Sequence, residues 1–262
     1  MRMKTKRPKV VIISGASSGI GKELCELYRS AGNIVVGLSR HADGDDHLDV
    51  DVTDYKRTQA AVDLIARTYG HIDTVIANAG AGLSGATELL PLEDIEYQTA
   101  LNFTGALNLV RCALKHMRSG GNAVFISSAC ALFALPFRAI YCASKAAVNM
   151  AAFGLYMELK AHGIRVSSIC PGDIRTGFTK NRVKRNDGGD RYGDRPAASA
   201  RKIDGREHKR MALKPAAQKI YKCALKSSKP LYIIGFKYKV LNFLRHILPQ
   251  KLFLDITAKI FG

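Results

Sequence analysis

The sequence predicts a single α/β domain over residues 1–262, in which helices cover both faces of one doubly wound parallel sheet. Short apolar runs that suit strands alternate with segments of helical apolar spacing from residue 9 to residue 172. The strand-like runs are almost continuously apolar, as is typical of parallel strands buried on both faces. The chain has 262 residues, of which 47% are hydrophobic, so it can form one substantial core.

The individual elements follow from this alternation. Aliphatic and β-branched runs, several of them ended by glycine, predict strands at 9–15, 33–39, 72–80, 122–128, 163–172 and 230–236. Amphipathic segments between them predict helices at 19–32, 55–70, 92–117, 139–161 and 214–228. The core of the domain is therefore expected at 10–179.

Two segments depart from the alternation. An insertion at 180–213 is rich in charge, and its residues 180–210 have almost no apolar periodicity. A segment of this length and composition predicts either a mobile functional loop or a disordered insertion. A C-terminal extension at 237–262 mixes apolar and basic residues. It could pack on its own core, contact a second copy in a homo-oligomer, or lie on a membrane surface.

The net charge of +18 is concentrated in a few places. Residues 180–229 hold 16 Lys and Arg against five Asp and Glu, and both termini are basic, whereas 10–179 is nearly neutral. Such segments are typical of a solvated surface or of contact with an anionic partner. They lack the interleaved aromatic residues of nucleic-acid binders, which argues against a nucleic-acid partner.

Other residue types narrow the class of protein. The six cysteines form no C-x-x-C pair and are expected to be free thiols of a cytoplasmic protein. The seven histidines show no ligand spacing, so we expect no metal site. No apolar run approaches the roughly 20 residues of a transmembrane helix, and the basic N-terminus is followed by no apolar leader.

A glycine-rich loop, "SGASSGIG" at 14–21, joins the first predicted strand to the first predicted helix. Glycines allow the backbone to approach a ligand closely, and the helix N-terminus favours an anion. This position is that of a dinucleotide phosphate loop, although a plain turn would also be rich in glycine. The expected contacts are Gly15, Ser17, Ser18, Gly19 and Ile20.

The end of the second predicted strand should lie near the adenosine ribose. NAD-selective sites commonly have an acidic residue there, but this chain has Ser39 followed by Arg40. A guanidinium pairs well with a 2′-phosphate, whereas a carboxylate would repel it. The sequence therefore favours NADP(H) over NAD(H).

Two Tyr–Lys pairs are spaced by one helical turn, Tyr141 with Lys145 and Tyr156 with Lys160. A phenol beside an ammonium could transfer protons, but this spacing also arises by chance. The spacing alone does not distinguish the two pairs.

Six motifs occur in order: "SGASSGIG", "ANAG" at 77–80, "ALNFTGAL" at 100–107, "ISSAC" at 126–130, "YCASK" at 141–145 and "CPGDIRT" at 170–176. Together they resemble the classical short-chain dehydrogenase/reductase (SDR) family over about 10–180. The resemblance implies a Rossmann-type fold and a catalytic tetrad of Asn102, Ser128, Tyr141 and Lys145. The family's serine lies 13 residues before its tyrosine, and counting back from Tyr156 reaches Ala143 instead.

The resemblance also implies a role for each side chain. Tyr141 would exchange a proton with the substrate oxygen, and Ser128 would bind that oxygen. Lys145 would lower the pKa of the phenol and hold the nicotinamide ribose. Asn102 would be linked to Lys145 through a water molecule.

Further cofactor contacts carry over by position. The family's matching residues are Asp51, Val52, Asn78, Gly80, Pro171, Gly172, Ile174 and Thr176. Ala77 departs from the more common asparagine, which puts a structural hydrogen bond in doubt. The family's frequent "DGG" near the C-terminus is absent, which weakens the implied oligomer.

The loop between Ser128 and Tyr141 is strongly apolar, with Leu132, Phe133, Leu135 and Phe137. It predicts an apolar lipid-, steroid- or acyl-like substrate, although these residues could equally serve core packing. We therefore expect an NADP(H)-dependent carbonyl reductase that interconverts a ketone and a secondary alcohol, with 180–213 as its substrate lid. The alternatives are a catalytically quiet nucleotide-binding regulator and a protein that binds an anionic partner or membrane surface.

Overall fold

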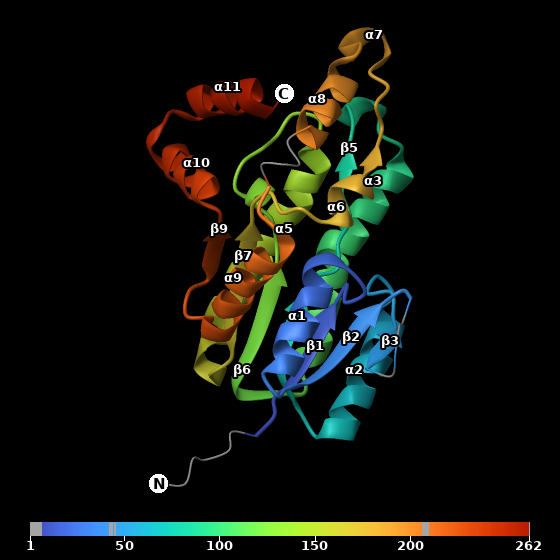
Figure 1. The fold of residues 1–262 in the computed structure, drawn as a ribbon, viewed down its shortest axis with the longest axis vertical. Helices are drawn as coiled ribbons and strands as arrows, with labels where there is room; N and C mark the ends of the chain where they lie inside the picture. The colour runs from blue at the N-terminus through green and yellow to red at the C-terminus, as the bar shows by residue number, and fades with distance from the viewer. Residues whose placement is uncertain (1–6, 42–43, 45, 206–209, 262) are drawn as a thin grey trace.

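The computed structural model describes residues 7–41, 44, 46–205 and 210–261. Its main sheet has seven parallel strands in the order β3-β2-β1-β4-β6-β7-β9 (Figure 1). The strands are β1 (Val10–Ser14), β2 (Ile34–Ser39), β3 (His47–Asp49), β4 (Ile72–Ala77), β6 (Met117–Ile126), β7 (Arg165–Pro171) and β9 (Leu231–Ile234). The order reverses direction at β1, and β1 and β4 lie side by side there. A doubly wound sheet binds ligands at this switch point, beyond the carboxyl ends of its strands.

Helices cover the sheet on both faces, each over its own apolar cluster. Leu24 and Tyr28 of one face pack in a cluster with Ile220 and Ala224. This face carries α1 (Gly19–Ser30) and α9 (Leu213–Lys226). The other face carries α2 (Tyr55–Tyr69), α4 (Ala106–Leu114) and α5 (Ala139–Glu158). The predicted α/β architecture is confirmed.

The predicted helix at 92–117 differs from what the structure contains. It consists of α3 (Leu92–Thr99), a π-helical turn (Ala100–Gly105) and α4, and residue 117 already belongs to β6. The short strands β3, β5 (Leu83–Ser84) and β8 (Val183–Lys184) were not predicted, because two or three residues give no measurable periodicity. Single 3₁₀ turns lie at Thr87–Leu89, Ala129–Ala131 and Lys160–His162.

The insertion is more ordered than its composition indicates. It contains β8, α7 (Gly189–Tyr192) and α8 (Arg195–Asp204), and it follows the short helix α6 (Gly177–Lys180). Pro196, Ser199, Ala200 and Ile203 are buried at helical spacing, so the expectation that 180–210 has almost no apolar periodicity is wrong for α8. Residues 206–209 lie outside the described residues.

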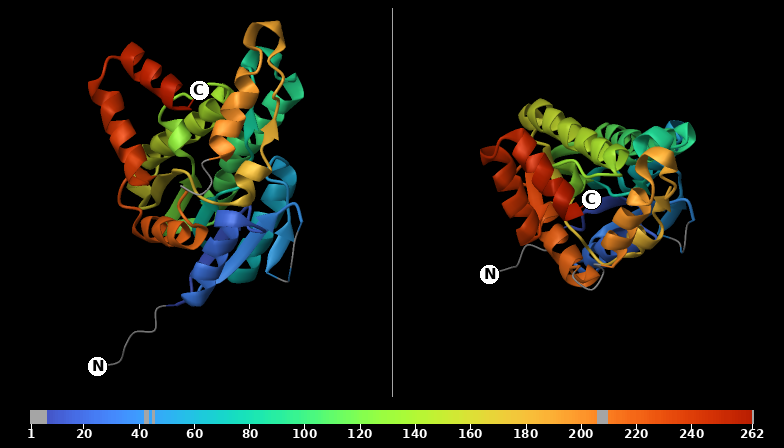
Figure 2. Two further views of the ribbon diagram at one scale, coloured as in Figure 1. Left: turned by 45° about the horizontal axis from the view of Figure 1, so that its top comes forward. Right: turned by 90° about the horizontal axis from the view of Figure 1, so that it is seen from above.

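The C-terminal extension supplies the surface on which α8 packs. It forms α10 (Phe236–Ile247) and α11 (Gln250–Phe261), which stand with α8 beyond the carboxyl ends of the strands (Figure 2). The Ser199 hydroxyl donates to the Phe261 carbonyl at 3.2 Å. Tyr238 and Phe253 are buried in a cluster with the loop after β6, so the tail folds back on its own core. None of the described helices is long and apolar enough to cross a bilayer.

Candidate active site

The glycine-rich loop joins β1 to α1 in a conformation that depends on glycine. Gly15 has φ of +64°, and a Cβ on it would lie 2.9 Å from the Ala79 Cα. Ser18 is the N-cap residue of α1, but its side chain makes no capping hydrogen bond. The first backbone N–H groups of a helix have no partner within the helix, and this end of α1 is therefore suited to an anion.

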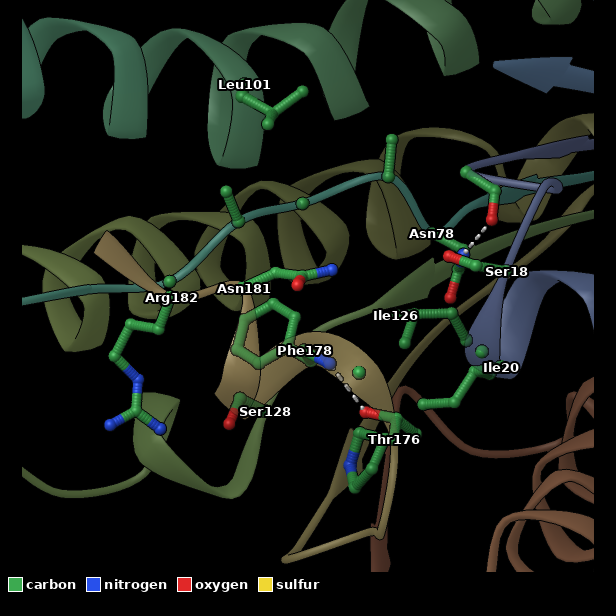
Figure 3. A pocket seen from close by; sticks show the side chains of 18 of the residues that line it. Ser18, Ile20, Asn78, Leu101, Ile126, Ser128, Thr176, Phe178, Asn181 and Arg182 are labelled. Atoms are coloured by element: carbon green, nitrogen blue, oxygen red, sulfur yellow. Dashed lines mark hydrogen bonds between the residues drawn. The ribbon is translucent and has the colours of Figure 1, made fainter. Parts of the chain in front are cut away.

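Space for such an anion lies between the loop and Thr176. Gly19 has φ of +53°, and the nearest atom to a Cβ there would be the Thr176 Cβ at 3.8 Å. The Thr176 hydroxyl accepts from the Phe178 amide at 3.2 Å and caps α6 (Figure 3). The glycines leave space between the loop backbone and the Thr176 hydroxyl. This space, at the N-terminus of α1, fits the pyrophosphate of a dinucleotide.

This loop forms one wall of a cavity of about 480 Å³. The structure brings every cofactor contact predicted from the sequence to its lining: Gly15, Ser17, Ser18, Gly19, Ile20, Ser39, Arg40, Asp51, Val52, Asn78, Gly80, Tyr141, Lys145, Pro171, Gly172, Ile174 and Thr176. They come from segments up to about 160 residues apart, because the carboxyl ends of parallel strands meet at one edge of the sheet.

The end of β2 reaches this cavity with Ser39 and Arg40, and neither residue is acidic. Ser39 is buried and its hydroxyl donates to the His41 carbonyl at 2.8 Å. Arg40 is exposed at the cavity lining, where its Nη1 donates to the Tyr97 hydroxyl at 2.8 Å. Asp51 also lines the cavity, but its carboxylate accepts from the Thr53 amide and hydroxyl. The end of β2 therefore presents the Arg40 guanidinium at the lining, and the Asp51 carboxylate beside it is engaged by Thr53.

Ser128, Tyr141 and Lys145 line the same cavity. Burial raises the pKa of Tyr141 and the Cys130 thiol adds to this rise, while the Ser128 hydroxyl and the Arg182 charge oppose it. Ser128 follows β6 and its Oγ accepts from the Cys130 amide at 3.1 Å. The phenol is therefore protonated at neutral pH and could act as a proton donor.

Lys145 lies one turn further along α5 and is only 4% exposed. Its Nζ donates to the Ile126 carbonyl at 3.1 Å. Burial lowers the pKa of this ammonium to about 8. Lys145 therefore stays charged at neutral pH. Because its surroundings are buried, this charge acts strongly on groups close to it.

Asn102 does not line the cavity but lies behind it, fully buried in the π-helical turn. Its Oδ1 accepts from the Ala81 amide at 2.8 Å, and its Nδ2 donates to the Ala81 carbonyl and to the Ser144 hydroxyl. A Cβ on Gly80 would be 3.0 Å from this Oδ1 and 3.3 Å from the Lys145 Nζ. Asn102 and Lys145 therefore face the same backbone segment.

The second Tyr–Lys pair lies elsewhere. Tyr156 packs at the edge of the core cluster under α2, α4 and α5, and Lys160 follows in a 3₁₀ turn. Neither residue lines the cavity. Of the two tyrosines, Tyr141 is thus the one at the cavity.

The family model described as short chain dehydrogenase matches residues 9–187. The chain belongs to the short-chain dehydrogenase family. A 3-ketodihydrosphingosine reductase of Bacteroides thetaiotaomicron is 37% identical over 182 residues, which are 67% of this chain and 68% of that protein. A Drosophila melanogaster SDR family protein 7-like dehydrogenase/reductase is 30% identical over 96% of this chain and 80% of its own length. A short-chain dehydrogenase from Streptomyces avermitilis has a TM-score of 0.82 at 26% identity, with 97% of this chain and 96% of that chain covered.

Ser14 and Ala77, two motif residues of this short-chain dehydrogenase, lie at the ends of neighbouring strands. The Ser14 hydroxyl accepts from the amides of Asn78 and Ala79, each at 3.0 Å, so it ties the end of β1 to the end of β4. The Asn78 side chain donates to the Ser14 carbonyl at 2.9 Å. Ala77 is buried at the end of β4 and can make no side-chain hydrogen bond.

The apolar loop of this dehydrogenase does not line the main cavity as expected. Leu132, Phe133 and Leu135 are buried against the C-terminal helices, where the Phe133 ring lies 6.1 Å from that of Phe253. Core packing therefore explains these side chains. Leu132 and Phe133 also line a second, mostly apolar cavity of about 450 Å³ between α5 and the C-terminal helices. Cys130 lines both cavities.

Several lining residues of the dehydrogenase were not predicted. One is Arg138 from the loop before α5. The others are Phe178, Asn181 and Arg182, at the start of residues 177–213, which we call the arm (Figure 3). The Phe178 and Tyr141 rings are 5.8 Å apart. No spacing rule identifies such residues, since they lie outside the long strands and helices. Their only sequence signal is their position next to the Tyr141 and Thr176 motifs.

Proposed function

We propose that this short-chain dehydrogenase interconverts a ketone and a secondary alcohol, with NADP(H) as cofactor and Tyr141 as general acid and base. The observation that carries the proposal is the convergence of the Ser128 hydroxyl, the Tyr141 phenol and the Lys145 ammonium on the cavity that contains the phosphate loop. When bound, NADP(H) would supply or accept the hydride.

The side chains of this chain would do the remaining work. Ser128 would hold the substrate oxygen, and Tyr141 would donate its proton to that oxygen as negative charge develops there. Lys145 would stabilise the resulting phenolate, since an opposite charge nearby favours the ionised form. Asn102 would act as a positioning residue, because it fixes the Ala81 backbone from behind the cavity.

The choice of NADP(H) rests on Arg40 and on Ser39, which stands where NAD-selective sites commonly have an acidic residue. Arg40 already lies at the lining with its guanidinium directed to Tyr97, and a 2′-phosphate would offer it a charged partner. The six free cysteines support a reducing, cytoplasmic setting in which NADPH is available.

An apolar region in the substrate is supported by the second cavity. It borders the catalytic residues at Cys130 and is lined by Leu132, Phe133, Leu248 and Phe253 among others. An alkyl or ring portion of the substrate could enter this space once the C-terminal helices move apart slightly. The name of the Bacteroides relative, a 3-ketodihydrosphingosine reductase, is in keeping with reduction of a ketone.

A membrane contact is supported by the outer face of α10. Phe236, Val240, Phe243 and Ile247 are exposed at helical spacing and form a stripe, while Tyr238 on the opposite side is buried. Residues 230–262 carry five basic side chains and one acidic side chain. We propose that this stripe lies on the surface of an anionic bilayer, with the basic residues near the lipid headgroups.

The experiment that tests the catalytic proposal is a panel of apolar ketones and alcohols, followed by the absorbance of the nicotinamide. We expect NADPH oxidation with at least one ketone. NADPH binding in calorimetry without turnover of any panel member would instead favour a nucleotide-binding regulator.

A further inference from the structure

Two arginines meet at the reactive end of the main cavity. Arg138 is the residue before α5 and so lies one turn ahead of Tyr141. Arg182 comes from the arm, and Figure 3 shows its guanidinium at the same end of the cavity as the Ser128 side chain. Burial lowers the pKa of Arg182, and the charge of Arg138 lowers it further. Both arginines line this cavity, and their like charges oppose each other there.

Each guanidinium keeps one buried nitrogen that no described residue satisfies. The Nε of Arg138 and the Nη1 of Arg182 are buried and have no hydrogen-bond partner among the described residues. The Asp204 charge offsets part of the burial cost of Arg182 from nearby, while its Oδ2 pairs with Lys184 at 2.7 Å and its Oδ1 makes no hydrogen bond to a described residue. Arg138 and Arg182 are half-buried, and a buried guanidinium nitrogen without a partner is costly unless a ligand supplies negative charge.

The phosphates of the cofactor do not fit this role. The phosphate loop and Arg40, which suit them, come from the ends of β1 and β2. The Arg182 charge instead acts on the Tyr141 phenol, and Arg138 lies one turn ahead of it at the N-cap of α5. The Tyr141 ring packs against Phe178 of the same arm. An anion held by both arginines would therefore belong to the molecule that reacts at Tyr141.

We propose that the substrate carries an anionic group, a carboxylate or a phosphate, a few bonds from its carbonyl, and that Arg138 and Arg182 bind this group. The inference rests on the proposed function and narrows its substrate class to keto acids or keto phosphates with an apolar remainder. Guanidinium groups suit both anions, because their fork geometry matches two oxygens at once.

The test compares each charged ketone with its neutral counterpart. The probes are 3-oxooctanoate with its methyl ester, and 5-oxohexyl phosphate with 6-hydroxyhexan-2-one. In wild type we expect a higher kcat/KM for the charged member of one pair, which also identifies the anion. Arg182→Gln should reduce that preference by roughly 10- to 100-fold, and Arg182→Lys by less. Arg138→Gln should act in the same direction.

Arg191→Gln is the matched control. Arg191 lies on the same arm, but it pairs with Glu88 at 3.0 Å and does not line the cavity. This variant should keep the wild-type preference. Equal losses for charged and neutral probes in Arg182→Gln would overturn the proposal, as would a neutral probe preferred by wild type in both pairs.

A second readout requires no turnover. Calorimetry in the presence of NADPH should show that octanoate binds wild type at least about tenfold more tightly than it binds Arg182→Gln, while octanol does not distinguish them. Equal octanoate affinities would overturn the anion site. Weaker octanoate binding without any turnover would support the anion site and count only against the proposed reaction.

Discussion

The Lys145 ammonium donates a hydrogen bond of 3.1 Å to the Ile126 carbonyl, at the end of the strand that leads into Ser128. This bond holds the lysine against the sheet on the side of the cavity. Because the side chain is buried there, its pKa falls from the ordinary 10.5 to about 8. Lys145 is therefore held in a fixed position, and keeping it charged there costs free energy of folding.

This cost should appear in the pH dependence of stability. Between about pH 8 and 10.5 the unfolded chain binds the Lys145 proton more tightly than the folded chain, so the contribution of Lys145 to stability rises with pH across this window. Urea unfolding of wild type and Lys145→Met at about pH 7.5 and about pH 9.5 should show wild type gaining on the order of 1–3 kcal/mol relative to the variant. A constant difference between the two proteins would contradict the lowered pKa.

Tyr141→Phe should nearly abolish turnover while NADPH still binds. The phenol is the proposed proton donor, and positioned proton transfer contributes roughly 10²–10⁴-fold. Turnover with the best ketone of the panel and calorimetric NADPH binding test both parts. Tyr156→Phe is the matched control on the same helix and should retain near wild-type turnover. More than about a tenth of the wild-type rate in Tyr141→Phe would rule out this assignment.

Arg40→Ala should change the choice of cofactor. Loss of the guanidinium should weaken NADPH binding by roughly 10- to 100-fold and NADH binding by far less, because only NADPH has the 2′-phosphate. Titration of both cofactors by calorimetry gives the two affinities. Arg67→Ala removes an exposed charge of α2 away from the cavity and should change neither affinity. Equal losses for both cofactors, or a wild type that prefers NADH, would refute the assignment.

The arm should behave as a lid in its first half only. Residues 177–194 contain Phe178 and Arg182 at the cavity but form only short helices, whereas α8 is already anchored on α11 by buried residues. Hydrogen exchange should show increased protection in 177–194 when NADPH and a substrate bind, and little change in α8. Exchange in 177–194 that is the same with and without ligands would exclude a lid.

The α10 stripe should bind vesicles according to their charge. Sedimentation with phosphatidylglycerol vesicles should carry down wild type, and pure phosphatidylcholine vesicles should carry down much less. Phe243→Asp should reduce binding, since Phe243 is 62% exposed in the middle of the stripe. Met157→Asp changes a residue that is 70% exposed on α5 and should bind like wild type. Retention of full binding by Phe243→Asp would place the contact elsewhere.

The sequence by itself determined the architecture and the main groups of the candidate site. The alternation of strands and helices depends on local periodicity, and the phosphate loop depends on the strand before it and the helix after it. The selection of Tyr141 over Tyr156 came from the resemblance to the family, whose serine lies 13 residues before its tyrosine. All these features are encoded within short segments whose order is fixed by the motifs.

Tertiary structure decided what depends on contacts between distant segments. From the sequence, Leu132 and Phe133 could either line a pocket or pack in a core. They pack in a core because α10 and α11 fold back over them. The buried face of α8 exists only because α11 lies against it. Arg138 and Arg182 belong to unrelated stretches of sequence, and their mutual repulsion arises only once the arm lies beside α5. No local pattern specifies such contacts, because burial and charge proximity are properties of the folded chain.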